Sequence, residues 1–199
     1  TKQYRIKDDD IENGSVTLVS DMDMREELGH SQFNDLSRII LQIQLRSTSS
    51  SGLLNAFNLS GTYLQYRKSL LNWCPIGRNC SSEEREKFAE MDKRQHIREQ
   101  LIYELEHCLY LTDLDSLMIS LGGETSIDIC PKGWDKTISL RSYLPSYFES
   151  VIFMGDRCKK GENDFTISEA VKILPNGRSF QVKSPTETMK LIEMREYCI

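Results

Sequence analysis

Apolar side chains recur at helical spacing in two parts of the chain. Within residues 25–45 they stand three or four positions apart and predict an amphipathic helix: Phe33, Leu36, Ile40 and Ile43. Farther along, Phe88 and Met91 predict a short helix, and the polar segment 92–96 interrupts the pattern. A longer helix is expected after this interruption, with an apolar face made of Ile97, Leu101, Leu105 and Cys108. We interpret the apolar stripe of this longer helix as core rather than as a binding site.

Short β-rich runs stand on both sides of the second helical stretch. Two of them flank Lys68-Ser69 and predict a hairpin, although a two-residue turn usually has Asn or Gly at a positive φ. Pro75 ends the second strand, and two further strands are expected at 117–121 and 125–129. Residues 62–130 therefore predict an antiparallel sheet that helices cover on one face.

The pattern changes after Pro131. Residues 136–143 and 186–198 are expected to form helices, and residues 151–154 and 180–182 to form strands. Strands that alternate with helices are typical of a parallel α/β sheet. Residues 46–60, which are rich in serine, are expected to form a flexible loop.

Composition argues against several classes of protein. The 199 residues carry a net charge of -5 and no basic stripe, which argues against a nucleic-acid partner. No apolar run approaches the length of a membrane span. The six cysteines form no Cys-x-x-Cys pair and the three histidines lie apart from them. We therefore expect no zinc site, and buried free thiols in a reducing cytosol.

Arginines surround a predicted helix start. Ser81 or Ser82 is expected to cap the helix, and Ser81 and Glu84 have the spacing of a capping box. Arg85 then lies in the first turn, where the helix dipole disfavours a cation. Free N–H groups beside an arginine suit an anion, and Arg67 and Arg78 could converge on the same point. On spacing alone, three solvated surface arginines are the slightly favoured alternative.

Polar residues of two other segments are candidates for ligand binding. Ser126 and Asp128 point to the same face of a strand, where they could bind sugar hydroxyls, although a solvated strand face is the simpler interpretation. Asp156 ends an apolar strand and Asp164 follows in the next loop. Ligands of open α/β sheets lie beyond the carboxyl ends of strands, and carboxylate oxygens suit Mg²⁺.

Three stretches resemble one family. Residues 67–85 read Arg-Lys-Ser-Leu-Leu-Asn-Trp-Cys-Pro-Ile-Gly-Arg-Asn-Cys-Ser-Ser-Glu-Glu-Arg. They are similar to the cap-domain signature Arg-Asn-Gly-x-Leu-Asn-x-Ser-Pro-Ile-Gly-Arg-x-Cys-x-x-Glu-Glu-Arg of eukaryotic phosphomannomutases, which belong to the haloacid dehalogenase superfamily. Residues 122–128 resemble the family's Gly-Gly-x-x-Ser-x-Asp, and residues 131–136 its Pro-x-Gly-Trp-Asp-Lys.

The resemblance assigns roles to residues at matching positions. It implies that Arg67, Arg78 and Arg85 bind the phosphate of a sugar phosphate, and that Ser126 and Asp128 contact the sugar. Lys136 is implied to lie near the transferred phosphoryl group, where a positive charge offsets developing negative charge. Asp156 is implied to be the metal carboxylate and Asp164 its support. The carboxylate of a second ion site aligns with Ala170.

The fold that the resemblance implies is α/β with an α+β cap. A haloacid dehalogenase-like core with a parallel sheet would be joined to a cap domain, which has a four-stranded antiparallel sheet covered by helices. We expect a core remnant at 1–21, the cap at 22–131 and the C-terminal part of the core at 132–199.

The nucleophile motif of the superfamily is not matched. Superfamily phosphotransferases use Asp-x-Asp-x-Thr after a first strand, with a nucleophilic and an acid/base carboxylate. Residues 16–23 imitate it with Asp21-Met22-Asp23, but Met24-Arg25 follow in place of Gly-Thr, and charged residues before a helix are the favoured interpretation. We therefore expect a chain that lacks the first core segment and is inactive alone.

The implied function is a phosphomannomutase, an isomerase that interconverts mannose 6-phosphate and mannose 1-phosphate for GDP-mannose synthesis. The resemblance implies Mg²⁺, a hexose bisphosphate activator, a homodimer formed through the cap and a cytoplasmic location, with no nucleic acid and no membrane. One alternative is a truncated, non-catalytic homologue that binds sugar phosphate or dimerises. Another is a sugar-phosphate phosphatase of the same superfamily.

Overall fold

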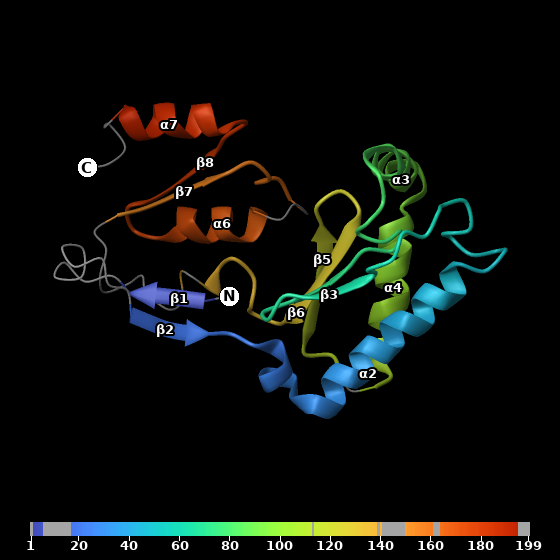
Figure 1. Ribbon diagram of the computed structural model, residues 1–199. Coiled ribbons are helices and arrows are strands. Elements are labelled where there is room, and N and C mark those ends of the chain that lie inside the picture. The colour runs from blue at the N-terminus through green and yellow to red at the C-terminus, as the bar shows by residue number, and fades with distance from the viewer. Residues whose placement is uncertain are drawn as a thin grey trace. The chain divides into compact units, whose positions relative to one another are not determined.

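The computed structural model describes residues 2–5, 17–112, 114–138, 140, 150–160 and 164–194, with only the backbone of 2–5 and 17–21. The chain divides into two compact units, residues 1–132 and 133–199 (Figure 1). The predicted boundaries at 21/22 and 131/132 stay a prediction. The first unit contains β1 (Lys2–Arg5), β2 (Thr17–Asp21), α2 (Met24–Ser47), β3 (Leu64–Tyr66), β4 (Leu71–Trp73), α3 (Ser82–Gln95), α4 (Ile97–Tyr110), β5 (Leu117–Gly122) and β6 (Ser126–Pro131).

Helix α2 confirms the first predicted stripe. Asp23 caps it, accepting a hydrogen bond from the backbone N–H of Arg25 at 2.9 Å, so the charged residues before α2 serve as its start. The helix is interrupted at Gly29, whose φ is 74°. Three of the four predicted apolar residues, Leu36, Ile40 and Ile43, are fully buried, and the fourth, Phe33, is half-buried.

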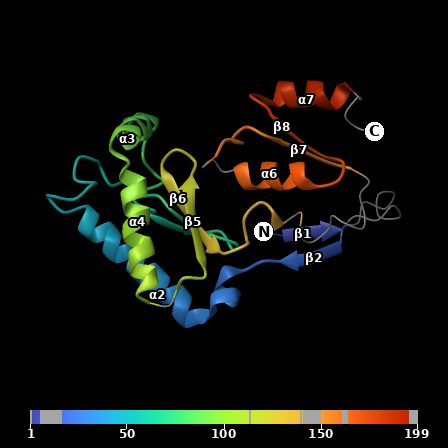
Figure 2. The same ribbon diagram turned by 180° about the vertical axis from the view of Figure 1, so that it is seen from behind.

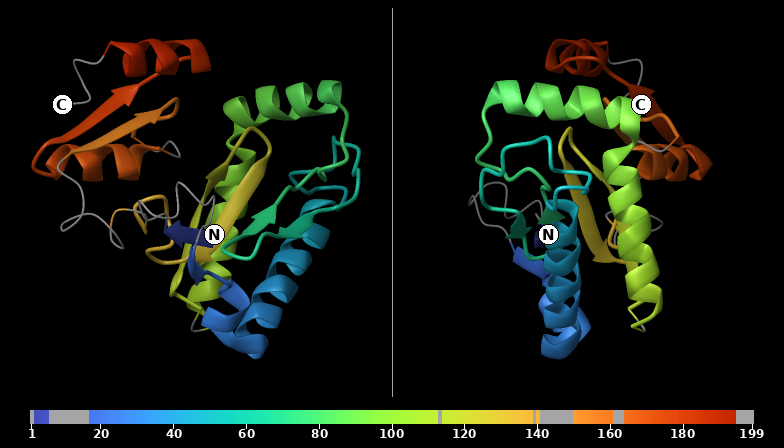
Figure 3. Two further views of the ribbon diagram at one scale, coloured as in Figure 1. Left: turned by 60° about the vertical axis from the view of Figure 1, so that its left-hand side comes forward. Right: turned by 90° about the vertical axis from the view of Figure 1, so that its right-hand side faces the viewer.

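Helices α3 and α4 meet at a sharp corner (Figure 3). Ser81 caps α3 with the predicted capping box, because its side chain accepts from the N–H of Glu84 and Glu84 accepts from the N–H of Ser81. The break between the two helices lies within the predicted segment 92–96, but it is confined to His96, with a φ of 54°, because α3 continues to Gln95. Each helix has 14 residues, so the expected short and long helices are also corrected.

The main sheet has the strand order β3-β4-β6-β5, and all its pairs are antiparallel, which confirms the predicted architecture. Helices α2 and α4 contact each other and the sheet on one side (Figures 1 and 2). Trp73, Ile127 and Ile129 are fully buried. The indole N–H of Trp73 donates to the side-chain oxygen of Gln44 at 2.7 Å, which ties α2 to β4.

The residues that alternate with these apolar ones point to the other face. They form a polar row in register across the four strands: Gln65, Asn72, Asp128 and Ser120. One face of the sheet therefore forms the core with the helices, and the opposite face carries polar groups.

The hairpin turn between β3 and β4 contains Lys68 and Ser69, where a tight turn usually has Asn or Gly. The N–H of Arg67 donates to the carbonyl of Leu70 at 2.9 Å, and the N–H of Ser69 donates to the carbonyl of Arg67 at 2.8 Å. Lys68, between them, is held at a φ of 61°. A residue with a side chain adopts this region at a cost, so the turn stores local strain.

Two remaining segments complete the first unit. β1 and β2 form an antiparallel pair. The expected loop after α2 consists of turns in which the N–H of Leu54 donates to the carbonyl of Ser47 at 2.8 Å. Leu54 is 1% exposed, so this segment contributes to the core.

The second unit contains a parallel pair of strands, as predicted (Figure 2). Its elements are β7 (Val151–Gly155), α6 (Phe165–Ile173), β8 (Gly177–Gln181) and α7 (Pro185–Glu193). The strand expected at 180–182 begins earlier, at Gly177, and α6 was not expected. Most of the helix expected at 136–143, and the end of the one expected at 186–198, lie outside the described residues.

Candidate functional site

Two of the predicted arginines lie over the polar face of the main sheet. The Nε of Arg78 donates to the side-chain oxygen of Asn72 at 3.1 Å, and the Nδ2 of Asn72 donates to Oδ1 of Asp128 at 2.5 Å. The Nε of Arg67 donates to the side-chain oxygen of Gln65 at 2.9 Å. Because Gln65, Asn72 and Asp128 are cross-strand neighbours, the sheet brings Arg67, Arg78 and Asp128 to one surface.

The third arginine reaches the same region from the first turn of α3. Arg85 donates from Nη2 to the backbone carbonyl of Arg78 at 3.0 Å and from Nη1 to the hydroxyl of Thr125 at 3.5 Å. Among the described residues, the recorded ion pairs involve other cations than these three arginines. Within residues 22–112 and 114–132, no carboxylate forms an ion pair with them, which suits an anionic ligand.

Ser126 and Asp128 lie on the polar face as expected, but they are engaged differently. The hydroxyl of Ser126 is buried and donates to the carbonyl of Gly122 at 2.9 Å, so it can still accept a hydrogen bond from a ligand. Asp128 is half-buried and accepts from Asn72. A Cβ at Gly122 would lie 2.7 Å from the Asp128 carboxyl carbon, so the glycine makes room for this carboxylate.

Sequence reasoning missed several residues that hold this site together. Asn72 and Thr125 bond to the arginines directly, as described above. Arg98 is buried and donates from Nε to the carboxylate of Asp92 at 2.8 Å. It also donates to the carbonyls of Gly122, Gly123 and Ser126 at 3.0–3.2 Å. Arg98 thus fixes the turn between β5 and β6. The available signal was an arginine next to the buried Ile97 in the apolar stripe.

In the second unit, the structure brings two of the predicted site residues together. Lys136 forms an ion pair with Asp164, whose Oδ2 also accepts from the backbone N–H of Arg157 at 3.3 Å. Burial raises the pKa of Asp164, but the hydrogen bonds from Lys136 and Arg157 and the charge of Lys136 outweigh it, so the pKa lies below its ordinary value. A Cβ at Gly155 would lie 2.7 Å from this carboxylate.

Two carboxylates of this unit are the predicted metal ligand and its support. Asp156 is exposed directly after β7, and Asp164 is buried directly before α6. Within the described residues, there is no group of three or more His, Cys, Asp or Glu side chains that could hold a metal. Mg²⁺ is usually bound by one or two carboxylates together with water and phosphate oxygens. Asp156 and Asp164 are therefore the kind of ligands that Mg²⁺ takes. Ala170, which aligns with the carboxylate of the family's second ion site, lies in α6.

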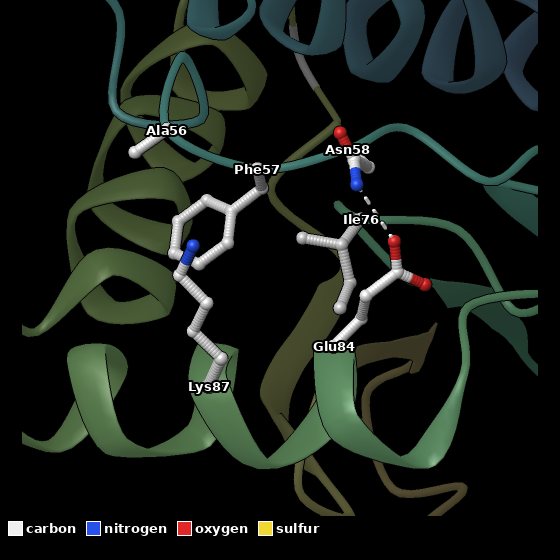
Figure 4. A pocket seen from close by; sticks show the side chains of 6 residues that line it. All are labelled: Ala56, Phe57, Asn58, Ile76, Glu84 and Lys87. Carbon is white, nitrogen blue, oxygen red and sulfur yellow. Dashed lines mark hydrogen bonds between the residues drawn. The ribbon is translucent and has the colours of Figure 1, made fainter.

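A small pocket lies elsewhere in the first unit, where the segment after α2 meets the start of α3 (Figure 4). It is lined by Ala56, Phe57, Asn58, Ile76, Glu84 and Lys87. Asn58 donates to Glu84 at 3.0 Å across it, and Glu84 is already used in the capping box. The pocket contains none of the predicted site residues. In the part of the chain that the structure describes, no helix combines the length and the apolar character needed to span a membrane.

Comparison with known proteins agrees with the family resemblance. The family model "Eukaryotic phosphomannomutase" matches residues 11–196. A phosphomannomutase of Arabidopsis thaliana is 44% identical over 130 residues, covering 65% of this chain and 49% of the relative. One of Drosophila melanogaster is 38% identical over 133 residues, covering 66% and 50%. The chain thus spans about half the length of the curated relatives it matches.

Proposed function

This chain belongs to the eukaryotic phosphomannomutase family, and on that basis we propose that it binds mannose phosphates and serves their interconversion between the 6- and 1-phosphates. The chain has the corresponding α/β fold, with a four-stranded antiparallel cap sheet and a parallel pair of strands. Interconversion is an isomerase reaction that transfers a phosphoryl group within one metabolite. The chain covers only about half the length of each relative. The phosphomannomutase activity of the complete relatives is therefore proposed, and not established, for this chain.

The observation that carries the proposal is the convergence of the arginines beside a carboxylate. Arg78 and Arg85 are joined through the Arg78 carbonyl, and Arg78 is joined to Asp128 through Asn72. A phosphate accepts hydrogen bonds from guanidinium groups, and a carboxylate accepts them from sugar hydroxyls. We assign the phosphate to Arg67, Arg78 and Arg85, and the hydroxyls to Asp128 and Ser126.

Residues of the second unit are assigned to the metal ion and to the transferred phosphoryl group. Asp156 would be a Mg²⁺ ligand and Asp164 its support, and Lys136 would contact the transferred phosphoryl group. The bound cation would supply stabilisation of charge on phosphate oxygens. The ion pair between Lys136 and Asp164 supports this assignment, because it holds these two side chains together.

The remaining properties follow from the family and are part of the proposal. They are a hexose bisphosphate activator, a homodimer formed through the cap, a cytoplasmic location and a contribution to GDP-mannose synthesis. The net charge of -5 does not favour a nucleic-acid partner, and the proposal includes none.

Titration calorimetry of the 199-residue chain with mannose 1-phosphate tests the proposed ligand. We expect saturable binding that is lost in a variant with Arg67, Arg78 and Arg85 all replaced by alanine. Mannose is the control ligand, since it lacks the phosphate and is expected to bind far more weakly. Equal binding of mannose and mannose 1-phosphate, or no binding by the wild-type chain, would contradict the proposal.

A further inference from the structure

Asn72 stands at the centre of the polar row. It lies in the middle of β4 and pairs with Gln65 on one side and Asp128 on the other. It is 1% exposed, so its side chain is almost completely removed from solvent. A buried amide is costly unless its donors and acceptor are satisfied, and here both ends of the amide are used.

The neighbours of Asn72 dictate its orientation. A guanidinium can only donate and an ionised carboxylate can only accept. The amide oxygen therefore faces Nε of Arg78, at 3.1 Å, and the amide nitrogen faces Oδ1 of Asp128, at 2.5 Å. A neutral amide is suited to bridging a cation and an anion in this way without cancelling the charge of either.

The Asn72 side chain keeps apart two opposite charges, Arg78 and Asp128, that could otherwise form a direct ion pair. In a partly buried site, a guanidinium and a carboxylate that meet directly form a strong pair. Such a pair would occupy the groups that the ligand needs. With Asn72 between them, Arg78 keeps its Nη groups for a phosphate, and Asp128 keeps its second oxygen for a hydroxyl.

We propose that Asn72 is a positioning residue that holds Arg78 and Asp128 at a fixed separation, so that the site recognises a phosphate and a sugar hydroxyl of the same molecule. This inference rests on the proposed function. It assigns to Asn72 a role in specificity, because a ligand that offers only a phosphate cannot use the Asp128 half.

The proposal is tested by Asn72→Ala in the full chain. We expect mannose 1-phosphate to bind about tenfold more weakly or worse, since losing one partner of a hydrogen bond to a charged group has an effect of this order. The affinity of the Asn72→Ala variant for inorganic phosphate, measured by competition, should fall less than its affinity for mannose 1-phosphate. Asn55→Ala is the matched control, because Asn55 is exposed and bonds to the carbonyl of Ser50.

A double-mutant cycle separates positioning from a structural role. If Asn72 acts through Arg78, the two effects are coupled. The total loss of affinity in the Asn72→Ala/Arg78→Ala double variant should then be at least about fivefold smaller than the product of the two single losses. Thermal melts record the stability of each variant. Should Asn72→Ala fail to fold, Asn72→Ser provides the same cycle, since a single short hydroxyl cannot bridge both partners.

The outcomes are distinct. Weakened binding with coupling to Arg78 supports the inference. Single effects that multiply, or an Asn72 variant that binds like the Asn55 control, overturn the inference and leave the proposed function in place. A wild-type chain that does not bind mannose 1-phosphate overturns the proposed function and this inference with it.

Discussion

Replacing Arg85 by alanine is expected to weaken mannose 1-phosphate binding strongly while changing stability little. A charge-assisted hydrogen bond to phosphate contributes about 1.5–3 kcal/mol, which corresponds to a loss of about tenfold to a hundredfold in affinity. Arg85→Lys should recover only part of this loss, because an ammonium group cannot reproduce the planar, two-pronged contact of a guanidinium.

The effect on stability is the difference of two small contributions. Alanine removes the bond from Nη2 to the Arg78 carbonyl, 3.0 Å long, which is worth about 0.5–1.5 kcal/mol. It also removes the contact from Nη1 to the Thr125 hydroxyl, which adds little because its length of 3.5 Å is at the limit of a hydrogen bond. It also removes a cation from the first turn of α3, where the helix dipole opposes it by about 0.3–1 kcal/mol. The two nearly cancel, so the free energy of unfolding should change by less than about 1 kcal/mol.

The assay is calorimetric titration with mannose 1-phosphate, paired with thermal melts of the same samples. Arg94→Ala is the matched control, because Arg94 is an exposed arginine in the last turn of the same helix. It should bind like the wild type. An Arg85→Ala variant that bound normally but melted much earlier would refute the reasoning and make Arg85 a structural residue.

Three further predictions concern the framework of the two units. Lys68→Gly should stabilise the chain by up to about 1 kcal/mol in urea unfolding, because glycine relieves the positive φ of 61° and loses only part of that gain to the greater entropy of its unfolded state. Asp92→Ala should destabilise it by roughly 3–5 kcal/mol in the same assay, because it leaves the buried Arg98 without its carboxylate. The pKa of Asp164 is lower in the folded chain than its ordinary value of 3.8, so its stabilisation is present above that value and is lost as the pH falls through the folded pKa. Replacing it by Asn should therefore destabilise the chain at pH 7, by breaking the pair with Lys136, and much less in acid.

The Asp92 and Asp164 predictions each have a control on the surface of the same unit. Asp35→Ala, which breaks the exposed pair with Arg38, should have little effect compared with Asp92→Ala. Glu169→Gln, which breaks the exposed pair with Lys172 in α6, should leave the pH profile of stability unchanged. A Lys68→Gly variant less stable than the wild type, or an Asp164→Asn difference that did not shrink in acid, would contradict the corresponding argument.

Short-range patterns in the sequence determined most of the elements of the first unit. The spacing of Leu36, Ile40 and Ile43 identified α2, and the Ser81–Glu84 capping box identified the start of α3. These signals are local, because helical neighbours lie three or four positions apart and a cap acts within one turn. The arginine motif was likewise read from the chain, although its roles remain a proposal.

The tertiary structure decided what depends on distant partners. Asp92 belonged to the polar segment that interrupts the apolar pattern, but it stays helical and buried because Arg98 pairs with it. Arg98 in turn donates to the carbonyl of Gly122 at the turn between β5 and β6. Asn72 had no visible role, because the register that places it beside Asp128 joins residues 56 positions apart. Sequence patterns report which residues are apolar, whereas the pairing of buried polar groups is set only when the strands and helices have packed together.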